Sequence, residues 1–125
     1  MTRDNLIVLA VDDDMINLKL LKSMLMRSGN VKEVVEAKNG SDAIGQLKGR
    51  DDIDLILLDI IMPIMGGIEM LKVVRADDNL RQLPIIVLTT DETKKSEALE
   101  YGANGFLMKP IRSADLMAKM ATVIV

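Results

Sequence analysis

The fold is decided by the segment Leu6–Asp14, which reads LIVLAVDDD: six consecutive apolar residues run directly into three carboxylates. The segment Asp54–Asp59, DLILLD, has the same form, and later apolar runs end at Thr89 and at Lys109-Pro110. Short apolar runs without polar alternation are typical of strands that are buried on both faces. They predict a parallel sheet covered by helices.

The polar residues that end these runs would meet at one edge of such a sheet. Parallel α/β sheets bind ligands outside the carboxyl ends of their strands. Asp12, Asp13 and Asp59 would therefore lie near the hydroxyl of Thr89 and the ammonium of Lys109. Carboxylate oxygens favour hard divalent cations such as Mg²⁺, and an ammonium binds phosphoryl oxygens as a point charge. The pattern predicts a site for a divalent cation and a phosphoryl group.

Length and composition limit the classes of protein that fit. The 125 residues have the usual size of one domain, and 49% hydrophobic residues argue against disorder. A net charge of -3 predicts no nucleic-acid or membrane partner, and the absence of cysteine fits a cytoplasmic protein. No apolar run reaches membrane-spanning length, and the first five residues leave no room for a signal peptide. The chain has no histidine, so any phosphoryl donor must come from outside it.

Apolar runs and helical patterns alternate five times along the chain. The expected strands are Leu6–Val11, Val31–Ala37, Asp54–Leu58, Pro84–Leu88 and Gly105–Met108. The expected helices run from Met15 to Ser28, from Ser41 to Lys48, onward from Gly67, from Asp91 to Tyr101, and onward from Ser113. This alternation predicts right-handed crossovers and a doubly wound α/β parallel sheet, formed by residues 1–125 as one domain.

Local signals predict how some of these helices begin and pack. Asp14 is expected to start the first helix, and Ser41 and Ser113 are expected to cap the second and the last. The side chains expected to face the core from the first helix are Ile16, Leu20, Leu21, Met24 and Leu25.

Four motifs together resemble those of response-regulator receiver domains. They are VDD at 11–13, LDIIMPIMGG at 58–67, LT at 88–89 and KP at 109–110, in the family's order and at its separations. The resemblance covers essentially the whole chain. It implies a flavodoxin-like (βα)5 fold whose five-stranded parallel sheet has the order 2-1-3-4-5. It also implies a two-component phosphorelay in which an aspartate is phosphorylated.

The resemblance also assigns roles to individual residues. Asp59 resembles the phosphoacceptor, whose carboxylate forms an acyl phosphate. Mg²⁺ or Mn²⁺ would be held by Asp13 and Asp59, by Asp12 directly or through water, and by the backbone carbonyl of Ile61. Thr89 and the ammonium of Lys109 would bind phosphoryl oxygens, and the bond from Lys109 to Pro110 is expected to be cis.

The family further implies partners and a switch. The phosphoryl donor would be a histidine kinase or a histidine phosphotransfer protein. Thr89 would move toward the phosphoryl group and Phe106 would turn inward, changing the surface of the fourth helix, the fifth strand and the fifth helix. That surface would bind a downstream protein or a second copy of the chain. The domain would be a signalling module that catalyses its own phosphorylation and dephosphorylation, and not an enzyme acting on an external substrate.

Other interpretations stay open for these residues. Taken singly, each is commonly structural: aspartates after strands cap helices, and strand-end threonines and exposed lysines often have no chemical role. A Mg²⁺-dependent phosphatase of the haloacid dehalogenase type would need an acid/base aspartate where Ile61 stands. A degenerate receiver would act by binding alone. A flavodoxin or a nucleotide-binding protein would need a phosphate-binding loop that the chain lacks.

Several positions depart from the commonest receiver pattern. Gly66 stands where aspartate is usual, and Thr90 replaces a smaller residue beside Thr89. Ile61 and Asp91 flank the expected path of a water that attacks the acyl phosphate. Apolar Ile61 offers this water no hydrogen bond, so the phosphorylated state is expected to decay slowly.

Overall fold

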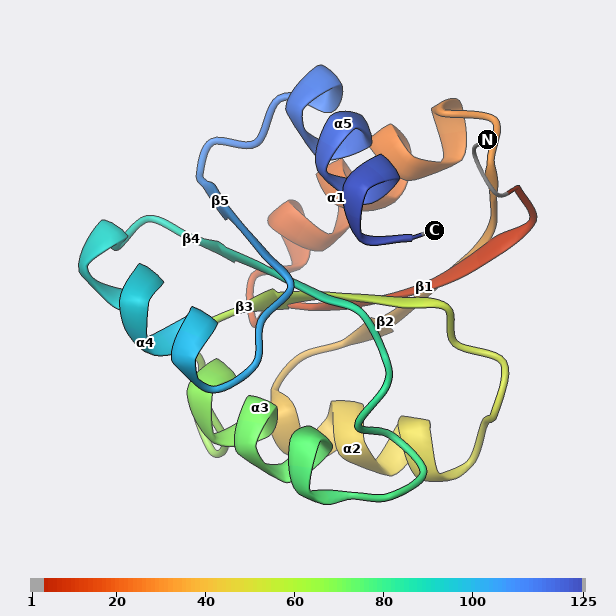
Figure 1. Ribbon diagram of the computed structural model, residues 1–125. Helices are drawn as coiled ribbons and strands as arrows, with labels where there is room; N and C mark the ends of the chain where they lie inside the picture. The colour runs from red at the N-terminus through yellow and green to blue at the C-terminus, as the bar shows by residue number, and fades with distance from the viewer. Residues whose placement is uncertain (1–3, 125) are drawn as a thin grey trace.

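The computed structural model describes residues 4–124, which form a five-stranded sheet between two layers of helices (Figure 1). The strands are β1 Leu6–Val11, β2 Val31–Ala37, β3 Leu55–Asp59, β4 Ile85–Thr89 and β5 Gly105–Met108. The helices are α1 Met15–Arg27, α2 Gly40–Lys48, α3 Gly67–Ala76, α4 Lys95–Glu100 and α5 Ser113–Val123, and a 3-10 turn at Glu92–Lys94 precedes α4.

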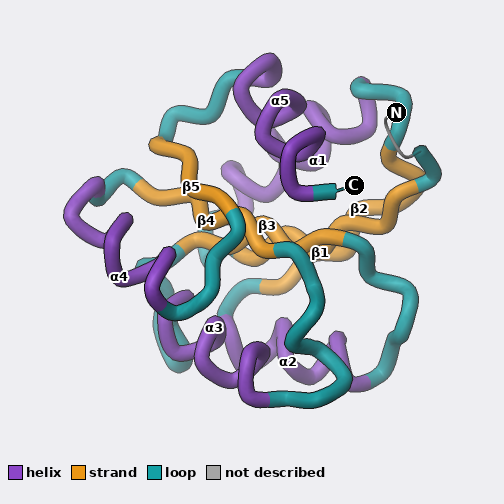
Figure 2. The backbone as a smooth tube through the Cα atoms, in the orientation of Figure 1, coloured by secondary structure: helices purple, strands orange, loops and turns teal. Residues whose placement is uncertain are grey.

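The sheet has the order β2-β1-β3-β4-β5, and every neighbouring pair of strands is parallel. The predicted fold class and strand order are therefore confirmed. Helices α1 and α5 cover one face of the sheet, while α2, α3 and α4 cover the other (Figures 1 and 2). Of the described helices, none has the length and apolar character needed to cross a bilayer.

Burial on both faces explains why the strands read as unbroken apolar runs. Successive side chains of a strand point to opposite faces. In β1, Ile7 and Leu9 join the core beneath α2 and α3, whereas Leu6 and Val8 join the core beneath α1 and α5. Each face of the sheet therefore needs apolar side chains, and no polar alternation remains.

The predicted apolar side of α1 was partly wrong. The helix buries Leu18, Leu21 and Leu25, whereas Ile16 is 71% exposed and Leu20 is 55% exposed. Residues spaced by three and four form one stripe along a helix. Ile16 and Leu20 lie off the stripe that faces the sheet. Of the remaining predicted side chains, Leu21 and Leu25 are in the core and Met24 packs against it.

Both predicted serine caps were wrong as well. Asn39 caps α2 by accepting a hydrogen bond from the backbone N–H of Asp42, so the helix begins at Gly40, before Ser41. Asparagine satisfies the free N–H groups of a first turn as well as serine does. Ser113 is the first residue inside α5, and no side chain caps that helix.

Some boundaries differ from the predicted ones. Strands β3 and β4 each begin and end one residue later than predicted, so they include Asp59 and Thr89. The segment expected as one helix from Asp91 to Tyr101 is a 3-10 turn followed by the short α4. Asp91 accepts hydrogen bonds from Thr93, which tightens this turn.

Candidate functional site

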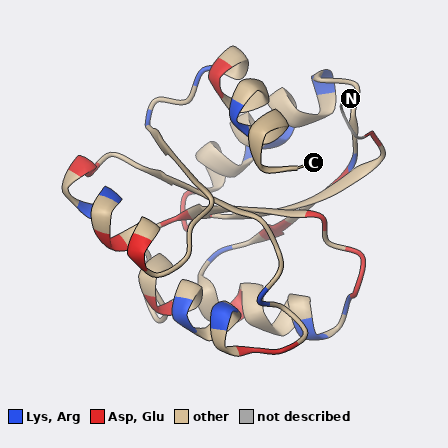
Figure 3. Cartoon of the chain, viewed as in Figure 1, with Lys and Arg blue, Asp and Glu red and all other residues tan. Residues whose placement is uncertain are grey.

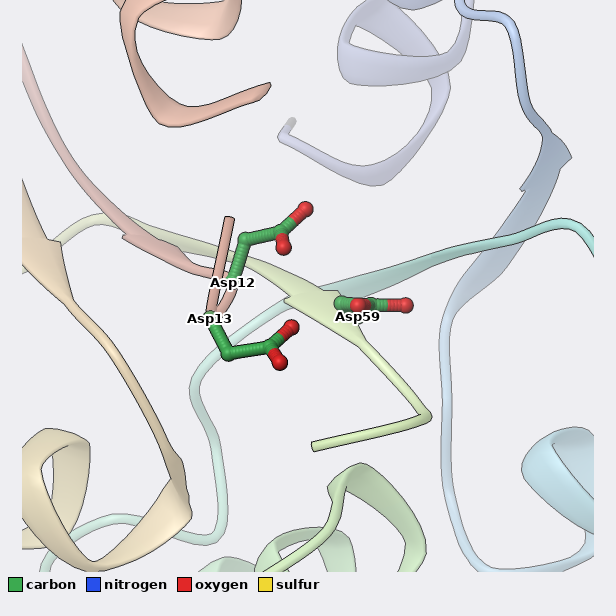
Figure 4. A group of neighbouring side chains, drawn as sticks. All are labelled: Asp12, Asp13 and Asp59. Atoms are coloured by element: carbon green, nitrogen blue, oxygen red, sulfur yellow. The ribbon is translucent and has the colours of Figure 1, made fainter. Parts of the chain in front are cut away.

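Three aspartates meet at the carboxyl ends of the two central strands. Val11 of β1 pairs with Leu58 of β3, so Asp12 and Asp13 follow β1 next to Asp59, the last residue of β3. Figure 4 shows the three side chains together at this edge. One carboxylate oxygen from each residue lies within 4.8 Å of the others. This spacing of hard oxygen donors fits a divalent cation such as Mg²⁺.

The three carboxylates differ in their exposure. Asp12 is 1% exposed and Asp59 is 8% exposed, whereas Asp13 faces solvent. Asp14 stands apart from the cluster and caps α1, accepting a 2.8 Å hydrogen bond from the N–H of Ile16. The backbone N–H of Asp14 in turn donates to Asp12 Oδ1 at 2.9 Å. The start of α1 therefore fixes one oxygen of Asp12 and leaves the other for charged partners.

Lys109 brings the positive charge of the site from the end of β5. Its Nζ donates a 2.8 Å hydrogen bond to Asp12 Oδ2 and lies 3.6 Å from Asp59 Oδ2. The backbone N–H of Lys109 donates to the carbonyl of Thr89 at 2.8 Å, and the peptide bond from Lys109 to Pro110 is cis. The ammonium thus lies between two buried carboxylates, where it can contact an anion bound beside Asp59.

Thr89 places a hydroxyl at the same edge, at the end of β4. Its side chain is 1% exposed, and β4 pairs with β3 through Leu88 and Asp59. The backbone N–H of Asp91 donates to Thr89 Oγ1 at 3.2 Å. In this bond the hydroxyl oxygen is the acceptor, so the hydroxyl group can still donate a hydrogen bond to a group near Asp59.

The environment raises the pKa of Asp59 above its ordinary value. Burial is the main cause, because it disfavours the charged carboxylate. The Lys109 ammonium opposes this rise in pKa, the neighbouring Asp12 adds to it, and hydrogen bonds from the backbone of Ile60 and Ile61 oppose it. Three carboxylates thus lie beside the ammonium of Lys109, and a divalent cation would neutralise the negative charge that the ammonium does not.

The loop between β3 and α3, residues 60–66, borders the acidic cluster. Ile61 is 59% exposed, and no side chain caps α3, whose N-cap position is Gly66. Ile64 has a φ of 68°, which is unusual for a β-branched residue and was not foreseen from the sequence. The role of the Ile61 carbonyl as a metal ligand stays a prediction.

Phe106 lies on β5 outside the acidic cluster. It is partly buried against the core beneath α3 and α4, and Lys95 Nζ lies 6.0 Å from the centre of its ring. Its role as a switch residue stays a prediction.

Within residues 4–124, no other group of three or more acidic side chains is spaced to hold a metal ion. A cavity of about 680 Å³ lies at the opposite end of the sheet, between the loops that precede β3 and β4. Basic and acidic residues are interspersed along the helices in the view of Figure 3.

The sequence predicted only a turn at Asn39-Gly40. The contact of this turn with the 60–66 loop was missed, because no motif in the sequence signals it.

Comparison with known proteins identifies the family of this chain. The model of the response regulator receiver domain family matches residues 8–121. The chemotaxis protein CheY1 of Helicobacter pylori is 34% identical over 119 residues, which cover 94% of this chain and 95% of that protein.

Two solved structures share the fold over nearly the full chain. One is the receiver domain of the sensor histidine kinase PA1611 from Pseudomonas aeruginosa, with a magnesium ion coordinated in its active site cleft. It is 29% identical in sequence and superposes with a TM-score of 0.85, and the match covers 96% of this chain and 98% of that one. The other is the CheX-CheY-BeF3-Mg complex from Borrelia burgdorferi: 29% identity, TM-score 0.84, covering 96% and 90%. The chain therefore belongs to the family of response regulator receiver domains.

Proposed function

We propose that this domain receives a phosphoryl group on Asp59, in the presence of Mg²⁺ or Mn²⁺, from the phosphohistidine of a histidine kinase or a histidine phosphotransfer protein. The observation that carries the proposal is the convergence of Asp12, Asp13 and Asp59, with oxygens within 4.8 Å of one another, beside the ammonium of Lys109. The 125 residues contain no histidine, so the donor histidine lies outside them.

Asp59 is the nucleophile of the proposed transfer. One of its carboxylate oxygens attacks the donor phosphorus, and the P–N bond of the donor phosphohistidine breaks as the O–P bond forms. The electron pair of the broken bond leaves with the imidazole nitrogen, and Asp59 becomes an acyl phosphate. Ionised Asp59 is the reactive form, because a negatively charged carboxylate is a much stronger nucleophile than the neutral acid.

Lys109 and Thr89 stabilise the phosphoryl oxygens. The ammonium lies 3.6 Å from Asp59 Oδ2, so a small movement would bring it onto a phosphoryl oxygen. Thr89 would donate its hydroxyl proton to another oxygen. The transfer depends chiefly on positioning and on electrostatic stabilisation of the transferred group.

The divalent cation would be held by Asp12, Asp13 and Asp59, together with the backbone carbonyl of Ile61. When bound, it neutralises the repulsion between the carboxylates and the incoming phosphoryl group. Asp13 is the exposed member of the set and gives the ion a path from solvent. Asp12, which is almost fully buried, also holds Lys109 in place.

Phosphorylation would then change the surface formed by α4, β5 and α5. It adds roughly two negative charges beside Thr89. We propose that Thr89 moves toward them and that Phe106 turns inward, shifting a pre-existing equilibrium between two surfaces. Leu99 of α4, Tyr101 directly after α4 and Met108 of β5 are exposed and would contact a downstream protein or a second copy.

The proposed role is that of a cytoplasmic signalling module that catalyses its own phosphorylation and dephosphorylation. Exposed, apolar Ile61 occupies the position at which an aspartate-nucleophile phosphatase needs its acid/base. Each polar residue of the predicted set lies at the site, which favours an active receiver over a degenerate one. The net charge of -3 and the mixture of acidic and basic residues along the described helices in Figure 3 do not favour nucleic acid or a membrane as a partner.

Hydrogen exchange with the phosphoryl analogue beryllofluoride tests this switch. Mg²⁺ and beryllofluoride are expected to change exchange rates in α4, β5 and α5 of the parent protein, and to leave the Asp59→Asn variant unchanged. Unchanged exchange in the parent, in a sample shown to bind the analogue, would contradict the proposed switch.

A further inference from the structure

The junction between β2 and α2, residues 37–40, contacts both loops of the acidic site although it contributes no chemical group to it. On one side, the carbonyl of Ala37 accepts a 3.0 Å hydrogen bond from the backbone N–H of Asp12. On the other side, the backbone N–H of Gly40 donates a 2.9 Å hydrogen bond to the carbonyl of Met65, in the 60–66 loop. We call residues 37–40 the bridge.

The contact between Gly40 and the 60–66 loop leaves no room for a side chain. A Cβ at position 40 would lie 2.7 Å from Met65 Cγ and 2.9 Å from Met65 Sδ and from the Met65 carbonyl oxygen. The thioether could turn away, but the oxygen belongs to the backbone. Any larger residue at position 40 must therefore displace the loop itself.

The 60–66 loop is held by apolar packing of Ile60, Met62 and Met65 against the core and by a few backbone hydrogen bonds. Its base is closed by a 2.9 Å hydrogen bond from the N–H of Gly67 to the carbonyl of Ile60. Within residues 4–124, the bond from Gly40 to Met65 is the one backbone hydrogen bond that joins this loop to an element other than β3 and α3. Through this bond, the bridge contributes to the position of the loop that carries Ile61.

The bridge itself is held rigid by hydrogen bonds with Asp42. Asn39 Oδ1 accepts a 2.8 Å bond from the N–H of Asp42, and the N–H of Lys38 donates to Asp42 Oδ2 at 3.1 Å. These reciprocal bonds fix the first turn of α2 and the chain that enters it. A rigid element bonded to two loops sets the distance between them.

We propose that Gly40 is a positioning residue for the divalent cation. Through the bridge, it sets the spacing between the loop that carries Asp12 and Asp13 and the loop that carries Ile61. This spacing in turn sets the affinity of the site for the cation. This inference rests on the proposed function, since it assigns a role toward the same cation. Groups that orient metal ligands from outside commonly change metal affinity by about 10–100-fold when they are altered.

The test compares Gly40→Ala with Gly45→Ala, a substitution in the same helix. A Cβ at Gly45 meets no atom within 4 Å, so this control adds the same methyl group without displacing anything. Calorimetric titration with MgCl₂ is expected to give a dissociation constant about tenfold weaker for Gly40→Ala and unchanged for Gly45→Ala. Cooperative thermal unfolding checks that each variant is folded. Equal affinities in the parent and in folded Gly40→Ala would overturn the inference.

Hydrogen exchange on the parent protein needs no variant. If the bond from Gly40 to Met65 favours cation binding, the cation must stabilise that bond by the same coupling free energy. MgCl₂ is therefore expected to slow exchange of the Gly40 amide, although Gly40 is not a ligand. An unchanged exchange rate in a parent that binds Mg²⁺ would overturn this inference and leave the proposed function intact. A parent that binds no Mg²⁺ would contradict the proposed function, and this inference with it.

Discussion

Lys109 Nζ donates a 2.8 Å hydrogen bond to Asp12 Oδ2, whereas the nearer oxygen of Asp59 lies 3.6 Å from the same atom. This ammonium is thus bonded to a carboxylate other than the proposed phosphoacceptor. Asp59 keeps a raised pKa, chiefly through burial and despite the ammonium beside it. The charge of the site is therefore only partly compensated by the protein itself.

Removing the charge of Asp59 is expected to stabilise the fold when no divalent cation is present. The pKa of Asp59 is raised in the folded state, so the ionised carboxylate penalises folding at neutral pH. Asp59→Asn should raise the melting temperature at pH 7 in EDTA by a few degrees. Mg²⁺ should then raise the melting temperature of the parent more than that of the variant.

Asp14→Asn is the matched control for this experiment. Asparagine caps a helix as well as aspartate does, and Asp14 lies outside the acidic cluster. Its response to Mg²⁺ should equal that of the parent. A lower melting temperature for Asp59→Asn in EDTA would show that burial of the Asp59 charge does not cost stability.

Replacing Ile61 should change the lifetime of the phosphorylated state. Ile61 is 59% exposed, two residues after Asp59, and its side chain cannot hydrogen-bond a water that attacks the acyl phosphate. Ile61→Asn supplies such a group, and decay is expected to be several-fold faster, measured as loss of the adduct by mass spectrometry. Ile64→Asn, at an 83% exposed position of the same loop, should leave the rate unchanged. Slower decay in Ile61→Asn would refute the assigned role.

Arg75 is expected to be important for the stability of the fold. All five of its N–H groups are directed at acceptors: the carbonyls of Gly102, Arg81 and Leu83, and the side-chain oxygen of Asn104, at 2.8–3.0 Å. Arg75→Leu would leave several partly buried acceptors without a donor. The free energy of unfolding, from urea denaturation, should fall by about 2–4 kcal/mol.

A second arginine provides the control for this loss. Arg27 makes one exposed 3.3 Å hydrogen bond, to the carbonyl of Ser23. Arg27→Leu should change the free energy of unfolding by less than about 0.5 kcal/mol. Similar losses in both variants would mean that the hydrogen bonds of Arg75 contribute little.

Arg50 should make the stability of the fold depend on pH in the acid range. Its hydrogen bonds to Glu33 and Asp52 lower the pKa of both carboxyls from their ordinary values of 4.5 and 3.8. A lowered folded-state pKa adds stability above the ordinary pKa, and this stability is lost as pH falls through the folded-state value. In Arg50→Gln, melting temperatures should be slightly lower than in the parent near pH 6, and the difference should vanish below these lowered pKa values.

Added salt separates this effect from packing. The three groups are solvent-exposed, so 0.5 M NaCl should shrink the difference in melting temperature. Arg81→Gln, which breaks a more exposed 3.5 Å pair with Asp78, is the control for loss of a guanidinium, and its melting temperature near pH 6 should stay close to that of the parent. A difference between parent and Arg50→Gln that does not shrink as pH falls below the ordinary pKa values of 4.5 and 3.8 would contradict the electrostatic explanation.

The fold was predictable from the sequence because its strands are buried on both faces. Unbroken apolar runs such as Leu55–Leu58 occur where helices cover a parallel sheet, and the polar residues after them mark the carboxyl edge. The convergence of Asp12, Asp13 and Asp59 followed from that topology alone. Their individual chemical roles came from the family resemblance and remain proposals.

The errors concern features that depend on tertiary contacts. Apolar Ile16 and Leu20 match a helical pattern, but the angle at which α1 meets the sheet decides which stripe is buried. Asn39 and Ser41 can both cap a helix, and the sequence does not show which one the chain uses. The contact between Gly40 and Met65 joins residues far apart in the chain, so no local pattern reveals it.

The most direct test of the central claim is the intact mass of the protein after incubation with acetyl phosphate and Mg²⁺. The parent and the Asp14→Asn control should each gain one phosphoryl group, and EDTA should abolish the gain. Asp59→Asn should gain none. A parent that stays unmodified, or an adduct that persists in Asp59→Asn, would contradict the assignment of Asp59 as the phosphoacceptor.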